Sequence, residues 1–204
     1  MKSMTRRQWL SLLAASAPLA ACDKLPLGGV KVGQYKALDI SGSAYNTNWR
    51  LTDMNGESRS LQDFAGKVVA VFFGFTQCPD VCPTTLFETV QAKKLLGADA
   101  DKLQVVFVTV DPERDTPELL REYMAAFDPQ FLALRPTPEE LRTLVAPSFK
   151  VYYKRVDSSD GKNYTMDHSA GTYLIDKKGK VRLHANYGTK PEDLVHDIKL
   201  LLAE

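Results

Sequence analysis

Residues 67–86, KVVAVFFGFTQCPDVCPTTL, carry the strongest indication of the fold of this chain. Residues 67–75 form a nearly unbroken run of apolar, β-branched and aromatic side chains, which is typical of a strand covered on both faces. Pro83 suits the first turn of a helix, and helical spacing of apolar residues continues through 84–97. The sequence therefore predicts a buried strand that runs directly into a helix, with two cysteines at the junction.

The segments around this junction continue the alternation of strands and helices. Asn-Gly within an alternating stretch predicts a β-hairpin at 51–61. The further expected elements are a buried strand at 103–110, a helix opened by Thr116 and Pro117, a short helix from Pro138, a strand, turn and strand at 172–187, and a closing helix at 190–204. This order predicts an α/β thioredoxin-like fold, in which a mixed central sheet is flanked by helices and the hairpin is an N-terminal extension.

The composition fits a single domain without a nucleic-acid function. A chain of 204 residues, 44% of them hydrophobic, is long enough for one buried core and short for two. Of its 26 basic and 25 acidic residues, Lys2, Arg6 and Arg7 precede residue 22, so the remainder of the chain is slightly acidic. The lack of a basic surplus argues against a general nucleic-acid binder.

The start of the chain carries signs of export and membrane attachment. A basic beginning, an apolar stretch and small residues before Cys22 predict that residues 1–21 are a signal peptide of lipoprotein type. The stretch LAAC resembles a lipobox and predicts lipidation of Cys22, and residues 5–10 resemble a twin-arginine export signal. Residues 22–36 would then be a lipidated tether and residues 37–204 the folded domain. A chance Ala-rich tail with an unmodified cysteine is the alternative.

Cys78 and Cys82 have three chemical options: a disulfide, a metal site or nucleophilic attack. On one helix face, residues four apart have Cβ atoms about 5–6 Å apart, which suits a disulfide or two thiolates on one metal. A helix N-terminus favours the thiolate, which both attacks disulfides and binds metals. The spacing is not the Cys-x2-Cys of the usual redox motif. Typical peroxiredoxins have a threonine three residues before the reactive cysteine, whereas Thr76 is two residues before Cys78. The second cysteine pair of a structural zinc site is missing. A purely structural disulfide stays open, although so short a loop stabilises little.

Of the three histidines, His168 is the candidate for a third ligand. It precedes the strand expected beside the cysteine helix, and Gly171 stands where thioredoxins have a cis-proline, which leaves room for the imidazole. A hydrogen-bonding histidine in that loop is the alternative, and His184 and His196 are expected to be surface or packing residues. Two thiolates and one imidazole favour copper, whereas zinc would need a fourth ligand such as Asp80 or a water.

Three motifs together resemble the Sco/SenC family of copper-binding proteins: FFGFTQCPDVCPTTL, VFVTVDPERDTPELLREY and YTMDHSAGTYLIDKKGKV. The resemblance spans residues 36–204, practically the whole expected domain. It implies a thioredoxin-like fold, with copper(I) and copper(II) bound by Cys78, Cys82 and His168. It also implies a role in building the dinuclear copper site of cytochrome c oxidase.

Three acidic residues within these motifs have open roles. The resemblance places Asp80 near the metal, either outside the ligands or as a weak extra ligand, and capping of the helix start is the alternative. Asp111 and Asp115 either shape the loop beside the metal or serve in helix capping and turn formation. Many family members have a transmembrane helix at the N-terminus, whereas the sequence before Cys22 in this chain predicts a lipid anchor instead.

The function implied by the resemblance is copper delivery rather than classical enzyme catalysis. A metallochaperone would carry copper to cytochrome c oxidase subunit II, and the redox state of the Cys78/Cys82 pair would gate delivery. An upstream copper donor or a thiol reductase would be a further partner, and lipid on Cys22 would hold the protein on the periplasmic side of the bacterial inner membrane. The alternative is a thiol-disulfide oxidoreductase that reduces the copper-site cysteines of subunit II, which does not need His168.

Overall fold

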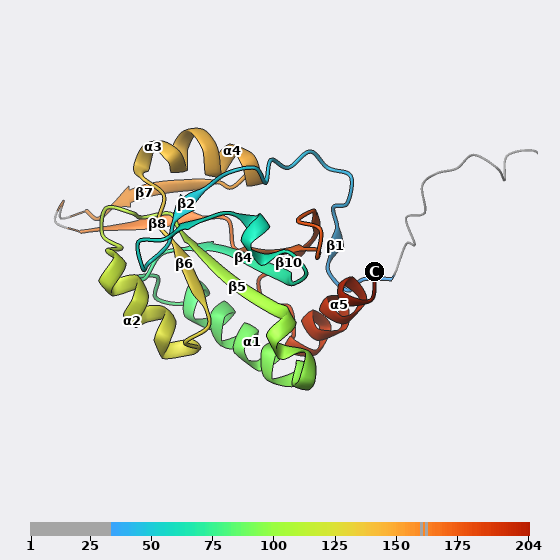
Figure 1. Cartoon of the computed structure of the whole chain (residues 1–204). Coiled ribbons are helices and arrows are strands. Elements are labelled where there is room, and N and C mark those ends of the chain that lie inside the picture. The colour runs from blue at the N-terminus through green and yellow to red at the C-terminus, as the bar shows by residue number, and fades with distance from the viewer. Residues whose placement is uncertain (1–33, 160, 162) are drawn as a thin grey trace, which may run out of the picture. The chain divides into compact units, whose positions relative to one another are not determined.

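A six-stranded mixed sheet lies at the centre of the chain, in the order β1-β10-β9-β4-β5-β6 (Figure 1). The computed structural model describes residues 34–159, 161 and 163–204. The strands are β1 (Leu38–Asp39), β4 (Val68–Gly74), β5 (Leu103–Thr109), β6 (Leu132–Leu134), β9 (Gly171–Ile175) and β10 (Val181–Asn186). β4, β5 and β6 pair in parallel, whereas β9 is antiparallel to both β4 and β10. The predicted mixed sheet is confirmed.

Helices cover both faces of this sheet (Figure 1). On one face lie α1 (Val81–Leu96), α2 (Pro117–Phe127) and α5 (Pro191–Ala203), and on the other lie α3 (Pro138–Glu140), a π-helical turn (Leu141–Val145) and α4 (Ala146–Phe149). Short 3₁₀ turns occupy Leu61–Phe64 and Gly97–Lys102. The expected helix after Thr116 is present, because its hydroxyl oxygen accepts the Leu119 N–H and Pro117 is the first helical residue. The predicted α/β fold is confirmed.

The central strand β4 is buried along its whole length, as its apolar run predicts. Phe72 packs against Phe107 on the face covered by α1 and α2, with ring centroids 5.9 Å apart. Its neighbour Phe73 points to the opposite face and packs against Phe149 of α4 at 5.3 Å. Because adjacent strand residues face opposite sides, one strand builds both halves of the core.

The predicted N-terminal hairpin is present but short. Its strands are β2 (Leu51–Thr52) and β3 (Ser58–Arg59). The buried carboxylate of Asp53 holds the turn, since it accepts the N–H groups of Asn55 and Glu57 and the guanidinium of Arg59. A bridge from Asp53 to Leu134 places the hairpin beside the edge strand β6.

A second hairpin, β7 (Tyr153–Asp157) with β8 (Tyr164–His168), was not expected from the sequence. It forms a two-stranded sheet of its own. His168 is therefore the last residue of a strand, and its assignment to a loop was wrong. The alternation of Tyr164, Met166 and His168 after an Asp-Gly pair was the available signal for this hairpin.

The expectations for the start of the chain lie outside the described residues. These are the signal peptide at 1–21, lipidation of Cys22 and most of the tether. Where the description begins, the Lys36 and Ala37 N–H groups donate to the buried Asp197 carboxylate of α5, at 2.8 and 2.7 Å. Among the described residues, no helix has the length and apolar character needed to cross a membrane.

Candidate metal centre

Three potential ligand atoms converge beyond the carboxyl end of β4. The sulfur atoms of Cys78 and Cys82 and a ring nitrogen of His168 all lie within 4.8 Å of one another. Both cysteines are free, and the Cys82 Sγ is 3.6 Å from the His168 Nε2. The structure thus brings together the two cysteines and the histidine that the sequence singles out, from elements 86 residues apart.

The four-residue spacing suggested that the two cysteines lie on one face of a helix, and this expectation was wrong. α1 begins at Val81, so Cys82 lies in its first turn, whereas Cys78 belongs to the preceding loop. The loop turns back because the Cys78 N–H donates to the Phe75 carbonyl, at 3.2 Å. As a result, the Cys82 N–H points at the Cys78 Sγ, 3.5 Å away, and the helix N-terminus faces this sulfur.

This geometry gives the two thiols opposite acidities. The pKa of Cys78 is lowered to about 4, first because the Cys82 thiol donates a hydrogen bond to its sulfur, with help from the backbone N–H groups of Asp80 and Cys82. The pKa of Cys82 is raised, first by the same bond to Cys78 and then by burial, since its side chain is 0% exposed. Cys78 is half-buried and therefore reachable. The pair combines an accessible thiolate with a buried thiol.

Backbone and aromatic contacts orient the imidazole of His168. Its Nδ1–H donates to the Ser169 carbonyl at 3.0 Å, which leaves the lone pair of Nε2 facing Cys82. The rings of Phe72 and Phe75 stand nearly perpendicular to the imidazole, with centroids at 6.2 and 5.8 Å. An imidazole held in this tautomer is ready to bind a metal through Nε2.

The space beside Gly171 is used differently from the sequence-based expectation. A Cβ on Gly171 would lie 2.1 Å from the Nε2 of His184, so the ring of His184 fills that space and not the ring of His168. His184 packs edge-on against Tyr173 at 4.8 Å, and its burial lowers its pKa. His184 is therefore a packing residue, as expected, and His168 reaches the cysteines from the end of β8.

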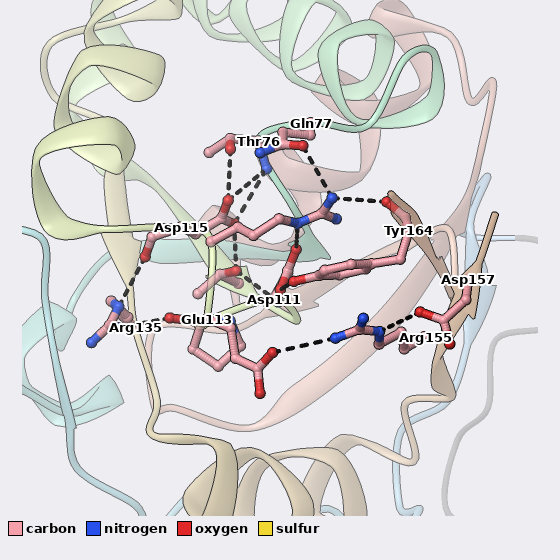
Figure 2. A network of polar contacts seen from close by, with 12 residues as sticks. Thr76, Gln77, Asp111, Glu113, Asp115, Arg135, Arg155, Asp157 and Tyr164 are labelled. Carbon is pink, nitrogen blue, oxygen red and sulfur yellow. Dashed lines mark hydrogen bonds and ion pairs between the residues drawn. The ribbon is translucent and has the colours of Figure 1, made fainter. Parts of the chain in front are cut away.

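Asp115 shapes the loop that carries Cys78. Its buried carboxylate accepts the N–H and the hydroxyl of Thr76, the latter at 2.6 Å, and the hydroxyl of Thr109 at 2.5 Å (Figure 2). Burial raises its pKa, against the effect of these hydrogen bonds. Of the two roles left open for this residue, the loop-shaping one matches its contacts.

Asp80 lies apart from the three converging atoms. It precedes the first residue of α1, but its exposed carboxylate makes no hydrogen bond to the helix backbone. Its recorded side-chain contact is with the Thr84 hydroxyl at 3.5 Å. The helix-capping alternative is therefore not realised by this side chain.

Several residues around the loop were missed by sequence reasoning. Arg114, Gln77 and Tyr164 form a polar network with Asp111 (Figure 2). No local pattern marks them, because an arginine next to acids in a turn is ordinarily a solvated residue. Their significance comes from contacts between segments that are distant in the sequence.

Comparison with known proteins identifies the family. The model of the SCO1/SenC family matches residues 39–203. This chain belongs to the SCO1/SenC family. An SCO2-like protein of Rickettsia prowazekii is 42% identical over 174 residues, which are 85% of this chain and 80% of that protein. The copper-bound structure of ScoI from Bradyrhizobium japonicum is 41% identical with a TM-score of 0.70, covering 78% of this chain and 99% of that one.

A third SCO1/SenC relative is described as a lipoprotein. It comes from Bacillus anthracis and is 26% identical, with a TM-score of 0.65 over 79% of this chain and 96% of that one. The thioredoxin-like architecture expected from the order of elements is thus the architecture of the family's solved structures.

The donor set of the centre fits copper chemistry. Thiolate sulfur is a soft ligand that selects copper(I) or zinc, and imidazole accommodates copper as well. Zinc would need a fourth ligand, which a water can supply, so ligand count does not separate the two metals. The copper-bound structure of the Bradyrhizobium japonicum relative supports copper at this Cys-Cys-His group.

Proposed function

We propose that this chain is a copper metallochaperone, which binds copper(I) and copper(II) through Cys78, Cys82 and His168. The observation that carries the proposal is the convergence of two sulfur atoms and one imidazole nitrogen within 4.8 Å. The copper-bound ScoI relative supports it, since SCO1/SenC proteins are copper-binding proteins of cytochrome c oxidase assembly. Asp80 is outside the group of three ligand atoms and is assigned no ligand role in this proposal.

Delivery proceeds by exchange of ligands with a partner. Cys78 and His168 are partly exposed, whereas Cys82 is buried, so an incoming thiolate or imidazole reaches the metal from the side of the first two. Cys82 is the last ligand to leave. The partner in this proposal is cytochrome c oxidase subunit II, whose dinuclear copper site receives the metal.

The redox state of the cysteine pair gates this exchange. When Cys78 and Cys82 are reduced, both sulfur atoms bind copper. Oxidation joins them in a disulfide, with two electrons passing to an oxidant such as a partner disulfide, and the metal loses two of its three ligands. A thiol reductase supplies the two electrons that restore the two thiols, and an upstream copper donor then reloads the reduced site.

The proposed location is the periplasmic side of the bacterial inner membrane, with Cys22 lipidated. The relative from Bacillus anthracis, itself described as a lipoprotein, supports this anchor. Residues 22–36 would let the domain reach a membrane-bound oxidase. Mass spectrometry of the membrane fraction tests the anchor, because a lipidated and processed chain begins at Cys22.

The metal site is tested by titrating the reduced full chain with copper(I) and copper(II) against a competing chelator. His168→Ala is compared with the parent and with His196→Ala, whose imidazole lies on α5 beside Asp197. We expect one copper per chain, a loss of copper(II) affinity of at least about tenfold in His168→Ala, and parent-like binding in His196→Ala. Equal affinity in all three proteins would reject the three-ligand site.

A thiol-disulfide oxidoreductase is the second candidate, favoured by the contrast between the two thiols. The Cys78 thiolate would attack a disulfide of subunit II, and Cys82 would then displace the second subunit II thiol. Subunit II would leave with two thiols, and the chain would keep the Cys78–Cys82 disulfide. This activity does not require His168, so a parent-like reduction rate in His168→Ala with impaired copper binding separates the two functions.

A further inference from the structure

The proposed ligands lie on two segments, here called arms: the loop and helix that carry Cys78 and Cys82, and the strand β8 that ends at His168. The two arms are not joined by a continuous sheet. His168 ends the β7–β8 hairpin, which forms its own two-stranded sheet. Cys78 and Cys82 lie on the loop and helix that follow β4. The position of the imidazole relative to the sulfur atoms therefore depends on side-chain contacts and on the short connection from β8 to β9.

Arg114 connects these two arms. Its Nη1 donates to the Gln77 side-chain oxygen at 3.1 Å, and Gln77 directly precedes Cys78. The same nitrogen donates to the Tyr164 carbonyl at 2.8 Å, and Tyr164 is the first residue of the strand that ends at His168 (Figure 2). One guanidinium nitrogen thus links the cysteine loop to the histidine strand.

Asp111 holds the guanidinium in place. The Arg114 Nε donates to one carboxylate oxygen of Asp111, and the Tyr164 hydroxyl donates to the other at 2.9 Å. Asp111 is buried, and its own N–H donates to the Thr109 hydroxyl at 2.9 Å. The Arg114 guanidinium carbon lies 3.6 Å from the centroid of the Tyr164 ring, so hydrogen bonds and cation–π attraction fix the same geometry.

Arg155 offers a natural comparison on the same tyrosine. Its guanidinium carbon lies 3.8 Å from the ring centroid of Tyr164, nearly the same distance as that of Arg114. However, its side chain is 52% exposed, against 21% for Arg114, and its ion pairs are with Glu113 and Asp157. Among the described residues, Arg155 stacks on the hairpin and pairs with Glu113 and Asp157 but not with the loop that carries Cys78.

We infer that Arg114 is a positioning residue, which holds the His168 strand at the distance from Cys78 and Cys82 that three-ligand copper binding needs. The inference rests on the proposed function. Two thiolates are soft ligands that retain copper(I) without an imidazole, whereas copper(II) gains more from the imidazole nitrogen. Loss of Arg114 therefore weakens copper(II) binding more than copper(I) binding.

The test is a double-mutant cycle on the reduced full chain, with Arg155→Ala as the matched control. Arg114→Ala is expected to lower copper(II) affinity about tenfold, as for other residues that orient metal ligands, and copper(I) affinity less than about threefold. In the His168→Ala background, Arg114→Ala is expected to cause no further loss, because it acts through the imidazole. Arg155→Ala is expected to bind like the parent.

A copper-free measurement separates this inference from the proposed function. Amide hydrogen exchange in β8 of the reduced apo protein is expected to be faster in Arg114→Ala and unchanged in Arg155→Ala. If the parent binds no copper, the proposed function fails, and the exchange rates still decide the role of Arg114. Equal exchange in both variants, or an equal loss of copper(II) affinity with and without His168, overturns the inference.

Arg114→Lys covers the case in which Arg114→Ala fails to fold. Lysine keeps a cation near the Tyr164 ring, but it lacks the planar fork that bonds Asp111 and both arms together. The same loss of copper(II) affinity is expected in a folded Arg114→Lys protein. Parent-like copper(II) affinity in this variant contradicts the bridging role.

Discussion

The sulfur of Cys82 lies where a side chain on residue 74 would begin. A Cβ added to Gly74 would come 2.7 Å from the Cys82 Sγ and 2.8 Å from the ring of Phe107. Such distances are too short for carbon contacts, so only glycine at the end of β4 lets α1 close this tightly over the strand. Gly74 at the end of β4 therefore determines how closely the Cys82 sulfur, one of the proposed ligands, packs against the sheet.

We therefore expect Gly74→Ala to destabilise the protein and to displace Cys82. Overpacking of this kind costs about 1–3 kcal/mol of unfolding free energy, which denaturant titration of the reduced protein measures. Copper affinity is expected to fall as well, because a shift of α1 moves one sulfur relative to His168. A variant with parent-like stability and copper affinity would show that α1 adjusts freely.

The unequal acidities of the two thiols predict selective alkylation. The lowered pKa of Cys78, about 4, means that its reactive thiolate persists as pH falls from 9 to well below 7. The rate of iodoacetamide modification at Cys78 is therefore expected to be flat above pH 6 and to decline only toward pH 4. Peptide mapping by mass spectrometry measures it.

Cys78→Ser is the control for this profile. It leaves only the buried Cys82 at the site, without its partner thiolate, and slow modification of the native protein is expected. In the parent, the pH profile of Cys78 modification could instead have its midpoint near the ordinary cysteine pKa of about 8.5. That result would contradict the hydrogen bonds assigned to the Cys78 sulfur.

Asp115 is expected to be a major contributor to the stability of the Cys78 loop. Asp115→Ala would leave the Thr76 N–H and the Thr76 and Thr109 hydroxyls without their acceptor. Buried donors without partners cost about 2–3 kcal/mol in unfolding free energy, measurable by denaturant titration. The exposed Asp101→Ala serves as the control and should leave the unfolding midpoint unchanged. Equal midpoints for the two variants would contradict the loop-shaping role.

Local patterns in the sequence predicted the central elements correctly. The apolar run before the cysteines predicted β4, and the capping signals Thr116 and Pro117 predicted α2, because burial and capping are properties of neighbouring residues. The hairpin β7–β8 was missed, since its strands are largely exposed and carry no continuous apolar signal. Its absence from the prediction left His168 assigned to a loop.

The residue types of the proposed site could be identified without a structure: two cysteines in one motif and a histidine in another. Their arrangement in space could not. The tertiary structure placed His168 3.6 Å from Cys82 across 86 residues of chain, and it filled the space beside Gly171 with His184. The physical reason is that periodicity reports which face of an element is buried. Which side chains meet across separate sheets depends on packing and on bridging residues such as Arg114.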